Sequence, residues 1–276
     1  MSSYENYNKT SLSYDAQGRI PVCSEEILAK IPDNSCVLDA GCGTGNYMLP
    51  LVLSGKVQKY TGFDANEGML NMIKSKVNLM DDDVKAKIEI KKISLLEKLP
   101  FEDDTFDVIL HNQVHHHITT PDESDRFLNV RPYLAEFQRV LKPGGMLTIN
   151  TCVHAQLETE WYVKGMPSVV RNTKLRFADH SELDNLLTDA GFKNLSAHTD
   201  SEPCLGEQYF DYEKCFTQEY REANSAWTMA DADDLVVFLE EMKVVLGDEK
   251  KRSEFDATVR KDLKDVGQTT QLFAWK

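Results

Sequence analysis

The chain has 276 residues, of which 41% are hydrophobic and 28% are charged, and this globular composition allows one large domain or two small ones. Its formal net charge is -14, and repulsion from phosphate groups disfavours nucleic acid and anionic membranes as partners. We therefore expect one elaborated domain with a small neutral or cationic partner, no nucleic acid and no membrane.

The amino terminus, MSSYENYNKTSLSYD, is polar and lacks the apolar core of a signal peptide. No run of the sequence approaches the roughly 20 apolar residues that cross a bilayer. These two features predict a cytoplasmic protein. The six cysteines lie far apart, without the CxxC spacing of a zinc or redox site, so reduced thiols and no metal are expected.

Short apolar runs alternate with helical patterns through the first two thirds of the chain, which indicates a parallel sheet with helices on both faces. The expected strands are residues 36–39, 60–64, 88–93, 106–110 and 146–151. The expected helices are residues 46–54, 67–76 and 131–141. Pro143 and the two glycines after it would stop the third helix.

The pattern changes towards the end of the chain. A helix at 181–190, capped by Ser181 and stopped by Gly191, and a strand at 192–198 come first. Residues 205–266 then look mostly helical, and a strand is expected at 269–275. Four residues of the helical part recur at the spacing of one helix face: Leu235, Leu239, Met242 and Leu246.

A turn with three alternate glycines, DAGCGTG at 39–45, joins the first strand to a helix. Missing side chains at Gly41, Gly43 and Gly45 would let a ligand approach the main chain at the helix amino terminus. A phosphate-binding loop is excluded because Asn46 follows where Lys is required, and the spacing is GxGxG rather than the dinucleotide GxGxxG. An ordinary strand-to-helix turn is the alternative.

Asp64 ends the neighbouring strand, in YTGFD. A carboxylate at this strand tip can accept hydrogen bonds from both ribose hydroxyls of an adenosine. The alternative is that Asp64 caps the next helix.

Four segments together resemble a known family: DAGCGTG (39–45), GFDANEGML (62–70), LPFEDDTFDVIL (99–110) and RVLKPGGML (139–147). They occur in the order and at the spacing of class I S-adenosylmethionine-dependent methyltransferases. Over roughly residues 20–200 the chain is similar to the small-molecule type, which includes the ubiquinone and menaquinone biosynthesis methyltransferases.

The resemblance implies an α/β, Rossmann-like fold. Its seven-stranded sheet would be mostly parallel, with helices on both faces and an antiparallel last strand beside the fifth. A helical cap would be inserted before that last strand. The implied division is an N-terminal lid with the first helix at 1–30, a methyltransferase core at 31–204 and 267–276, and the cap at 205–266.

The same resemblance assigns residues to S-adenosylmethionine. Asp39 and the three glycines would shape the pocket for the methionine part, with Cys42 contributing main chain. Asp64 would hold the ribose, and Ala65 and Met69 would pack against adenine. The acidic or amide residue that many relatives carry before LPF is absent here, and Ser94 is the substitute candidate.

The segment HNQVHHHI (111–118) follows the fourth strand. The resemblance places His111, Asn112 and Gln113 near the sulfonium and the amino acid end of the cofactor. His116 occupies the position of the family histidine and is the first candidate for a general base, with His117 the second, because an imidazole has a suitable pKa. A polar helix start is the alternative. On a helix the three histidines would diverge by about 100° each, so they could not share one metal.

Two segments could enclose the site. Tyr7, Tyr14 and Arg19 resemble the N-terminal lid of related enzymes, with a disordered polar tail as the alternative. Three aromatic side chains and one methionine of residues 158–177 could form an aromatic wall against a cationic or apolar substrate, or the core beneath the cap. They are Trp161, Tyr162, Met166 and Phe177.

The sequence therefore predicts methyl transfer from S-adenosylmethionine to a small-molecule acceptor by in-line displacement, with the accepting atom and the oligomeric state left open. The missing adenine-side acid and the altered histidines leave a catalytically reduced, cofactor-binding regulatory protein as an alternative. A protein-modifying methyltransferase is another, because an acidic surface attracts basic tails. An arsenic methyltransferase would require Cys23, Cys152 and Cys204 to converge.

Overall fold

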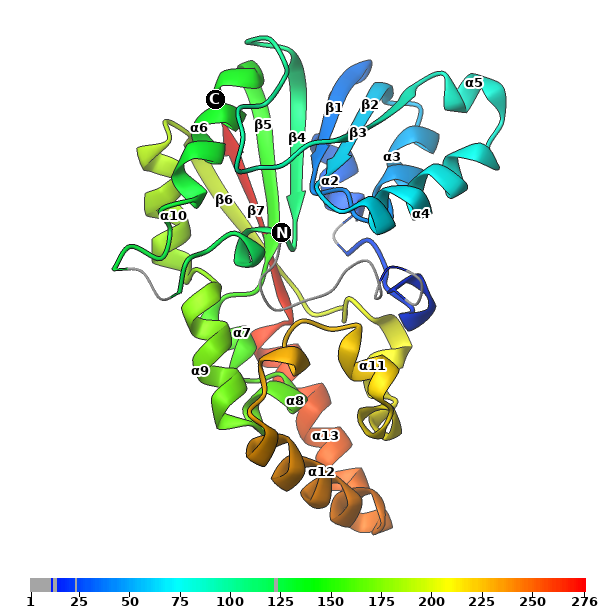
Figure 1. Cartoon of the computed structure of the whole chain (residues 1–276), viewed down its shortest axis with the longest axis vertical. Coiled ribbons are helices and arrows are strands. Elements are labelled where there is room, and N and C mark those ends of the chain that lie inside the picture. The colour runs from blue at the N-terminus through cyan, green and yellow to red at the C-terminus, as the bar shows by residue number, and fades with distance from the viewer. Residues whose placement is uncertain (1–10, 12–13, 23, 122–123) are drawn as a thin grey trace.

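The computed structural model describes residues 11, 14–22, 24–121 and 124–276. Within them seven strands form one sheet in the order β3-β2-β1-β4-β5-β7-β6 (Figure 1). The strands are β1 (Ser35–Ala40), β2 (Val57–Asp64), β3 (Ile88–Lys92), β4 (Phe106–Asn112), β5 (Leu141–Thr151), β6 (Lys193–Asp200) and β7 (Thr269–Trp275). Strands β1 to β5 pair in parallel, and β7 runs antiparallel to both β5 and β6. The expected fold class is confirmed.

Helices cover both faces of this sheet. One face packs against α2 (Ser24–Lys30), α3 (Met48–Leu53) and α4 (Glu67–Asn78), which α5 (Asp82–Lys85) follows. The other face packs against α6 (Val130–Val140) and α10 (His180–Asp189). Successive side chains of a strand point to opposite faces of the sheet. Val37 of β1 therefore packs with α2, α3 and α4, and Leu38 packs with α6 and α10. A strand buried on both faces carries an unbroken apolar stretch, as residues 36–38 of β1 do.

A second group of helices lies below the sheet in Figure 1, towards the carboxyl end of β4. It contains α7 (His154–Leu157), α8 (Trp161–Lys164), α9 (Pro167–Arg176), α11 (Gln218–Glu222), α12 (Ala232–Leu246) and α13 (Glu249–Val266). Short 3-10 turns join these and other elements: η1 (Asp15–Gln17), η2 (His115–His117), η3 (Gly206–Phe210), η4 (Tyr212–Phe216) and η5 (Trp227–Met229).

The second group has its own aromatic core, centred on Trp161. The Trp161 ring lies within 6.4 Å, centroid to centroid, of six other rings: Tyr162, Tyr209, Tyr212, Trp227, Phe238 and Phe255. The four residues expected on one face of α12 all pack against this cluster, so that prediction is confirmed. The cluster joins residues 152–177 to residues 205–263. A division at residue 205 stays a prediction.

Several boundaries differ from the sequence-based expectation, and two of these differences have a clear structural cause. Helix α10 begins at His180, and its N-cap is Asp179, whose N–H donates to Glu182 Oε2 at 2.8 Å; the expected cap Ser181 is already helical. Strand β5 begins at Leu141, directly after α6, rather than at residue 146. Leu141 pairs with Phe106, and the ladder shifts register before Val108. This irregularity lets the Pro-Gly-Gly segment lie within the strand.

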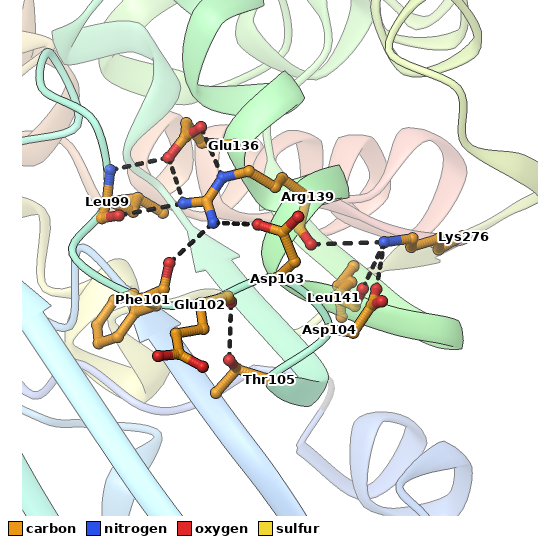
Figure 2. A network of polar contacts seen from close by, with 10 residues as sticks. All are labelled: Leu99, Phe101, Glu102, Asp103, Asp104, Thr105, Glu136, Arg139, Leu141 and Lys276. Carbon is orange, nitrogen blue, oxygen red and sulfur yellow. Dashed lines mark hydrogen bonds and ion pairs between the residues drawn. The ribbon is translucent and has the colours of Figure 1, made fainter.

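The loop before β4 is held to α6 by a polar network (Figure 2). Arg139 donates to the carbonyl oxygens of Leu99 and Phe101 and pairs with Glu136 and Asp103. Because this loop precedes β4, the network lies at the amino ends of the parallel strands, away from the glycine turn. In the part of the chain that the structure describes, no helix is both long and apolar enough to cross a membrane.

Candidate functional site

The three glycines after β1 all have positive φ, at +85°, +52° and +84° for Gly41, Gly43 and Gly45. A Cβ on Gly41 would lie 2.5 Å from Val114, and one on Gly45 would lie 2.7 Å from Ile73. A Cβ on Gly43 would meet nothing within 4 Å. The outer glycines are therefore required by packing, whereas the middle one leaves open space beside the main chain, as a ligand would need.

Asp64 lies directly against this turn. Its Oδ2 accepts a hydrogen bond from Gly43 N at 3.1 Å, and its Oδ1 accepts one from Asn66 N at 2.8 Å. Burial raises the pKa of Asp64, while these N–H donors act in the opposite direction. The N-cap of α4 is Asn66, which accepts from Met69 N at 3.0 Å. The helix-cap interpretation of Asp64 is therefore wrong.

Asp39 lies behind the turn, only 3% exposed. Its Oδ2 accepts a hydrogen bond from the Tyr60 hydroxyl at 2.6 Å. Burial raises the pKa of Asp39 to about 7, against the effect of the Tyr60 hydrogen bond. The turn itself is fastened to β2, because Gly41 N and Cys42 N both donate to Phe63 O at 2.9 Å.

The residues expected around adenine follow β2 and β3. Ala65 is half-buried directly after Asp64, and Met69 is buried in the first turn of α4. Ser94 lies two residues beyond β3, and its hydroxyl accepts a hydrogen bond from Leu96 N at 3.2 Å. Ile93 N donates to Asp64 O, so Ser94 is close to the expected ribose contact.

The end of β4 carries two polar residues with different surroundings. His111 is fully buried; its Nδ1 donates to Ala40 O at 3.0 Å, which leaves Nε2 to accept from the Tyr133 hydroxyl at 3.2 Å. Both nitrogens are thus satisfied within the fold. The amide of Asn112 is also buried, yet neither its oxygen nor its nitrogen has a hydrogen-bond partner among the described residues. Buried polar atoms are normally paired, so Asn112 indicates a place for a ligand.

The histidines of η2 are packed rather than solvated. The ring of His116 stacks on Phe177 at a centroid distance of 4.2 Å and lies 4.0 Å from the ring of His117. Burial lowers the pKa of His117 to about 3 and that of His116 well below its usual value. Both imidazoles are therefore neutral at pH 7, and for the same reason they are weak bases.

A cavity, the edge pocket, opens at the carboxyl ends of β4 and β5 and encloses about 590 Å³ including its mouth. It is lined by Tyr14, Arg19, Gln113, His116, His117, Cys152, Leu157, Glu160, Tyr162, Phe177, Cys204, Asn224, Ser225, Ala226, Gln268 and Thr269. Both candidate bases and Tyr14 are therefore brought together.

Two members of the predicted aromatic wall, Tyr162 and Phe177, line the edge pocket, whereas Trp161 and Met166 belong to the core beneath it. Sequence reasoning missed Glu160 and Gln268. The only signal for Glu160 was an acidic residue directly before a run of buried aromatic residues. Gln268 lies more than one hundred positions further along the chain and gave no local signal.

The segment before α2 connects the glycine turn to the helical group. The Thr44 hydroxyl donates to Asp15 Oδ1 at 2.6 Å, and Lys76 pairs with Asp15 Oδ2 at 2.8 Å. Arg19 lies over the Tyr14 ring at 4.1 Å and donates to Ala223 O at 2.7 Å. The expected lid residue Tyr7 lies outside the described residues.

The described residues do not support thiol or metal chemistry in the edge pocket. Cys152 and Cys204 both line the edge pocket, but burial raises the pKa of each thiol, that of Cys204 to about 11, so neither is a thiolate at pH 7. Cys23 lies outside the described residues. Among the residues that are described, no three His, Cys, Asp or Glu side chains could hold a metal ion together.

Comparison with known proteins identifies the family to which the chain belongs. The model of a methyltransferase domain matches residues 31–191. A demethylmenaquinone methyltransferase of Bacillus subtilis is 28% identical over 200 residues, which is 62% of this chain and 77% of that protein.

Two solved structures share the fold. A protein of Anabaena variabilis, described as a methyltransferase from an antibiotic biosynthesis pathway, has a TM-score of 0.66 at 17% identity, covering 94% of this chain and 99% of that one. Phosphoethanolamine N-methyltransferase 2 of Haemonchus contortus, solved with phosphomonomethylethanolamine and S-adenosylhomocysteine, has a TM-score of 0.59 at 15% identity, covering 97% and 57%. The family model covers more than half of the chain, which therefore belongs to the methyltransferase-domain family and is an S-adenosylmethionine-dependent methyltransferase.

Proposed function

We propose that this enzyme methylates a small-molecule acceptor bound in the edge pocket, by in-line displacement at the sulfonium of S-adenosylmethionine. The observation that carries the proposal is the adjacency of the two halves of the site. Val114 packs where a Cβ of Gly41 would lie, and its neighbour Gln113 lines the edge pocket. Donor and acceptor would meet at this point of the sheet edge.

The cofactor would be held by the residues around the glycine turn. Open space at Gly43 and the unsatisfied amide of Asn112 both fit such a ligand. The proposed contacts are Tyr14, Asp39, Gly41, Cys42, Gly43, Gly45, Asp64, Ala65, Met69, Ser94, His111 and Asn112. Of these proposed cofactor contacts His111 has the least support, because both nitrogens of its ring already have hydrogen-bond partners. When bound, S-adenosylmethionine supplies a methyl group on a sulfonium, which is an excellent leaving group.

The chain must therefore supply alignment and exclusion of water. The segment with Tyr14 and Arg19 and the wall with Tyr162 and Phe177 enclose the edge pocket for this purpose. His116 and His117 are the proposed catalytic residues. Their low pKa values favour accepting a hydrogen bond that orients the acceptor over removing its proton.

A pocket of this size favours a small molecule over a protein tail, which would need a long groove. A labelling experiment separates the three possibilities. The enzyme is incubated with methyl-labelled cofactor and a native metabolite and protein extract. Label in the small-molecule fraction supports our proposal, label in protein supports a protein-modifying enzyme, and binding without any transfer supports a regulatory protein. A cytoplasmic location stays part of the proposal.

The cofactor geometry has its own test. Replacing Asp64 with alanine (Asp64→Ala) removes the expected ribose acceptor, and we expect S-adenosylhomocysteine to bind at least tenfold more weakly, a loss of about 1.4 kcal/mol or more, in isothermal titration calorimetry. The matched control is Glu67→Ala, which removes an exposed carboxylate three residues away that pairs with Lys92 at 2.8 Å. Equal affinity in both variants would rule out the proposed ribose contact.

A further inference from the structure

Glu160 is an acidic residue of the edge pocket that the proposed function does not use. Its side chain is 7% exposed, yet it lines the pocket. Glu160 precedes the short helix α8 as its N-cap residue, and its side chain makes no capping hydrogen bond. The carboxyl group therefore does not cap the helix and is available to a ligand.

Among the described residues, no cation pairs with this carboxyl group. The Tyr162 hydroxyl and the Gln268 side chain lower its pKa against the effect of burial, although Gln268 Nε2 makes no hydrogen bond within that part of the chain. Arg19 lines the same pocket, but it lies over the Tyr14 ring and donates to a backbone carbonyl. A buried carboxylate without a cation is costly by several kcal/mol. A bound cation would relieve this cost.

Two hydrogen bonds position the side chains of Tyr162 and Gln268 beside Glu160. Asn224 Nδ2 donates to the Tyr162 oxygen at 3.0 Å, which leaves the Tyr162 proton to point towards Glu160. Cys204 N donates to Gln268 Oε1 at 2.6 Å, which orients that amide from the other side. The Tyr162 ring is itself stacked on Trp227 at 5.2 Å. The arrangement is thus built before any ligand arrives.

Aromatic side chains complete the surroundings of Glu160. Tyr14, Tyr162 and Phe177 line the same pocket. Aromatic faces attract ammonium groups, and a carboxylate among aromatic rings is a typical ammonium site. We propose that the methyl acceptor is an amine, bound as its ammonium form with Glu160 as counter-ion and proton acceptor. This inference rests on the proposed function and names the substrate class of the same pocket.

The chemistry balances within the site. A proton moves from the ammonium nitrogen to a carboxylate oxygen of Glu160. The freed lone pair on nitrogen forms the new N–C bond as the S–C bond breaks, and the electron pair of that bond stays on sulfur. Burial raises the pKa of Glu160 to about 7, near the pH at which a base works best, whereas His117 has a pKa of about 3.

Binding of a matched pair of probes tests the inference. Benzylamine and benzyl alcohol have nearly the same shape, and only benzylamine is cationic at about pH 8. With S-adenosylhomocysteine present, we expect the full-length protein to bind benzylamine at least tenfold more tightly than benzyl alcohol. Glu160→Gln should abolish this preference, and Glu158→Gln, an exposed residue that pairs with Lys174 at 2.6 Å, should keep it.

The outcomes separate the two proposals. Failure of the wild-type protein to bind S-adenosylhomocysteine would count against the proposed function itself. Normal cofactor binding with no preference for benzylamine, or a preference that Glu160→Gln retains, would overturn the amine inference alone.

A second variant covers the case in which Glu160→Gln does not fold. Tyr162→Phe removes one donor to the carboxylate and should weaken benzylamine binding a fewfold, with benzyl alcohol unaffected. An unchanged benzylamine affinity in Tyr162→Phe would also overturn the inference.

Discussion

At the scale of single residues, the three glycines after β1 have different structural roles, although they look equivalent in the sequence. All three have positive φ, which costs any other residue roughly 1–2 kcal/mol. Gly45 faces the buried side chain of Ile73, whereas Gly43 faces open space. Replacing each glycine in turn should therefore distinguish an effect on the stability of the fold from an effect on ligand binding.

We expect Gly45→Ala to lower the free energy of unfolding by about 2–3 kcal/mol, because φ strain adds to the contact with Ile73. Gly43→Ala should lose only about 1 kcal/mol but should weaken S-adenosylhomocysteine binding at least tenfold, since its methyl group enters the ligand space. Urea unfolding and calorimetry measure the two effects.

Gly55→Ala is the control for Gly43→Ala, because Gly55 also has positive φ and open surroundings but lies on the turn before β2. It should show the same loss of stability with unchanged cofactor affinity. Equal cofactor affinity in Gly43→Ala and Gly55→Ala would contradict the assignment of the open space to a ligand.

At the scale of elements, the loop before β4 depends on one side chain of α6. Figure 2 shows the Arg139 guanidinium between Glu136, Asp103 and the carbonyl oxygens of Leu99 and Phe101. The planar fork of arginine suits several acceptors at once, which a lysine could not match. Glu136 also accepts from Leu99 N at 2.9 Å, so the loop is held from both sides.

Arg139→Ala should therefore destabilise the protein by about 2 kcal/mol in urea unfolding, because it leaves two backbone carbonyls without their donor. Arg139→Lys should recover less than half of this loss. The control is Arg131→Ala on the same helix, which removes an exposed ion pair with Asp125 and should cost less than about 1 kcal/mol. Equal losses for the two alanine variants would show that the network adds nothing to an ordinary surface pair.

At the scale of the whole molecule, two sets of buried groups act on stability in opposite directions. Burial lowers the pKa of His111 to about 4 and the pKa values of His115 and His117 to about 3. Burial also raises the pKa values of Asp39 and Glu160 to about 7. The histidines stabilise the fold above their unfolded pKa of about 6.5, and the carboxyls stabilise it below theirs, near about 4.

We expect the free energy of unfolding to change little near pH 7, where the carboxyl and histidine contributions oppose each other, and to fall increasingly steeply from about pH 6 to 4. In the lower range the four buried imidazoles, which take up protons on unfolding, outnumber the carboxyls of Asp39 and Glu160, which release them. Urea unfolding at each pH measures this.

Above about pH 5 self-repulsion gives the opposite expectation, because the net charge of -14 at pH 7 shrinks as the pH approaches the pI near 5.0. High salt screens that repulsion but not the burial of histidines, so the fall below pH 5 should persist in salt. A stability that rises from pH 5 to 4 would contradict the histidine assignment.

The sequence by itself determined the sheet, the helices on its two faces and the residues of the glycine turn. These depend on signals within short segments, such as the period of apolar residues and the conformations open to glycine. The pairing of Asp64 with Gly43 could be expected for the same reason, because adjacent parallel strands end at one edge.

Only the tertiary structure decided what surrounds each functional group. Glu160, Cys204 and Gln268 lie far apart in the chain and meet in one pocket because the helical group folds back onto the carboxyl ends of the strands. Burial sets the pKa of a carboxyl or an imidazole and leaves the Asn112 amide without a partner among the residues that the structure describes, and burial is a property of the packed molecule. Burial cannot be predicted from the local sequence, since desolvation arises from neighbours that are distant along the chain.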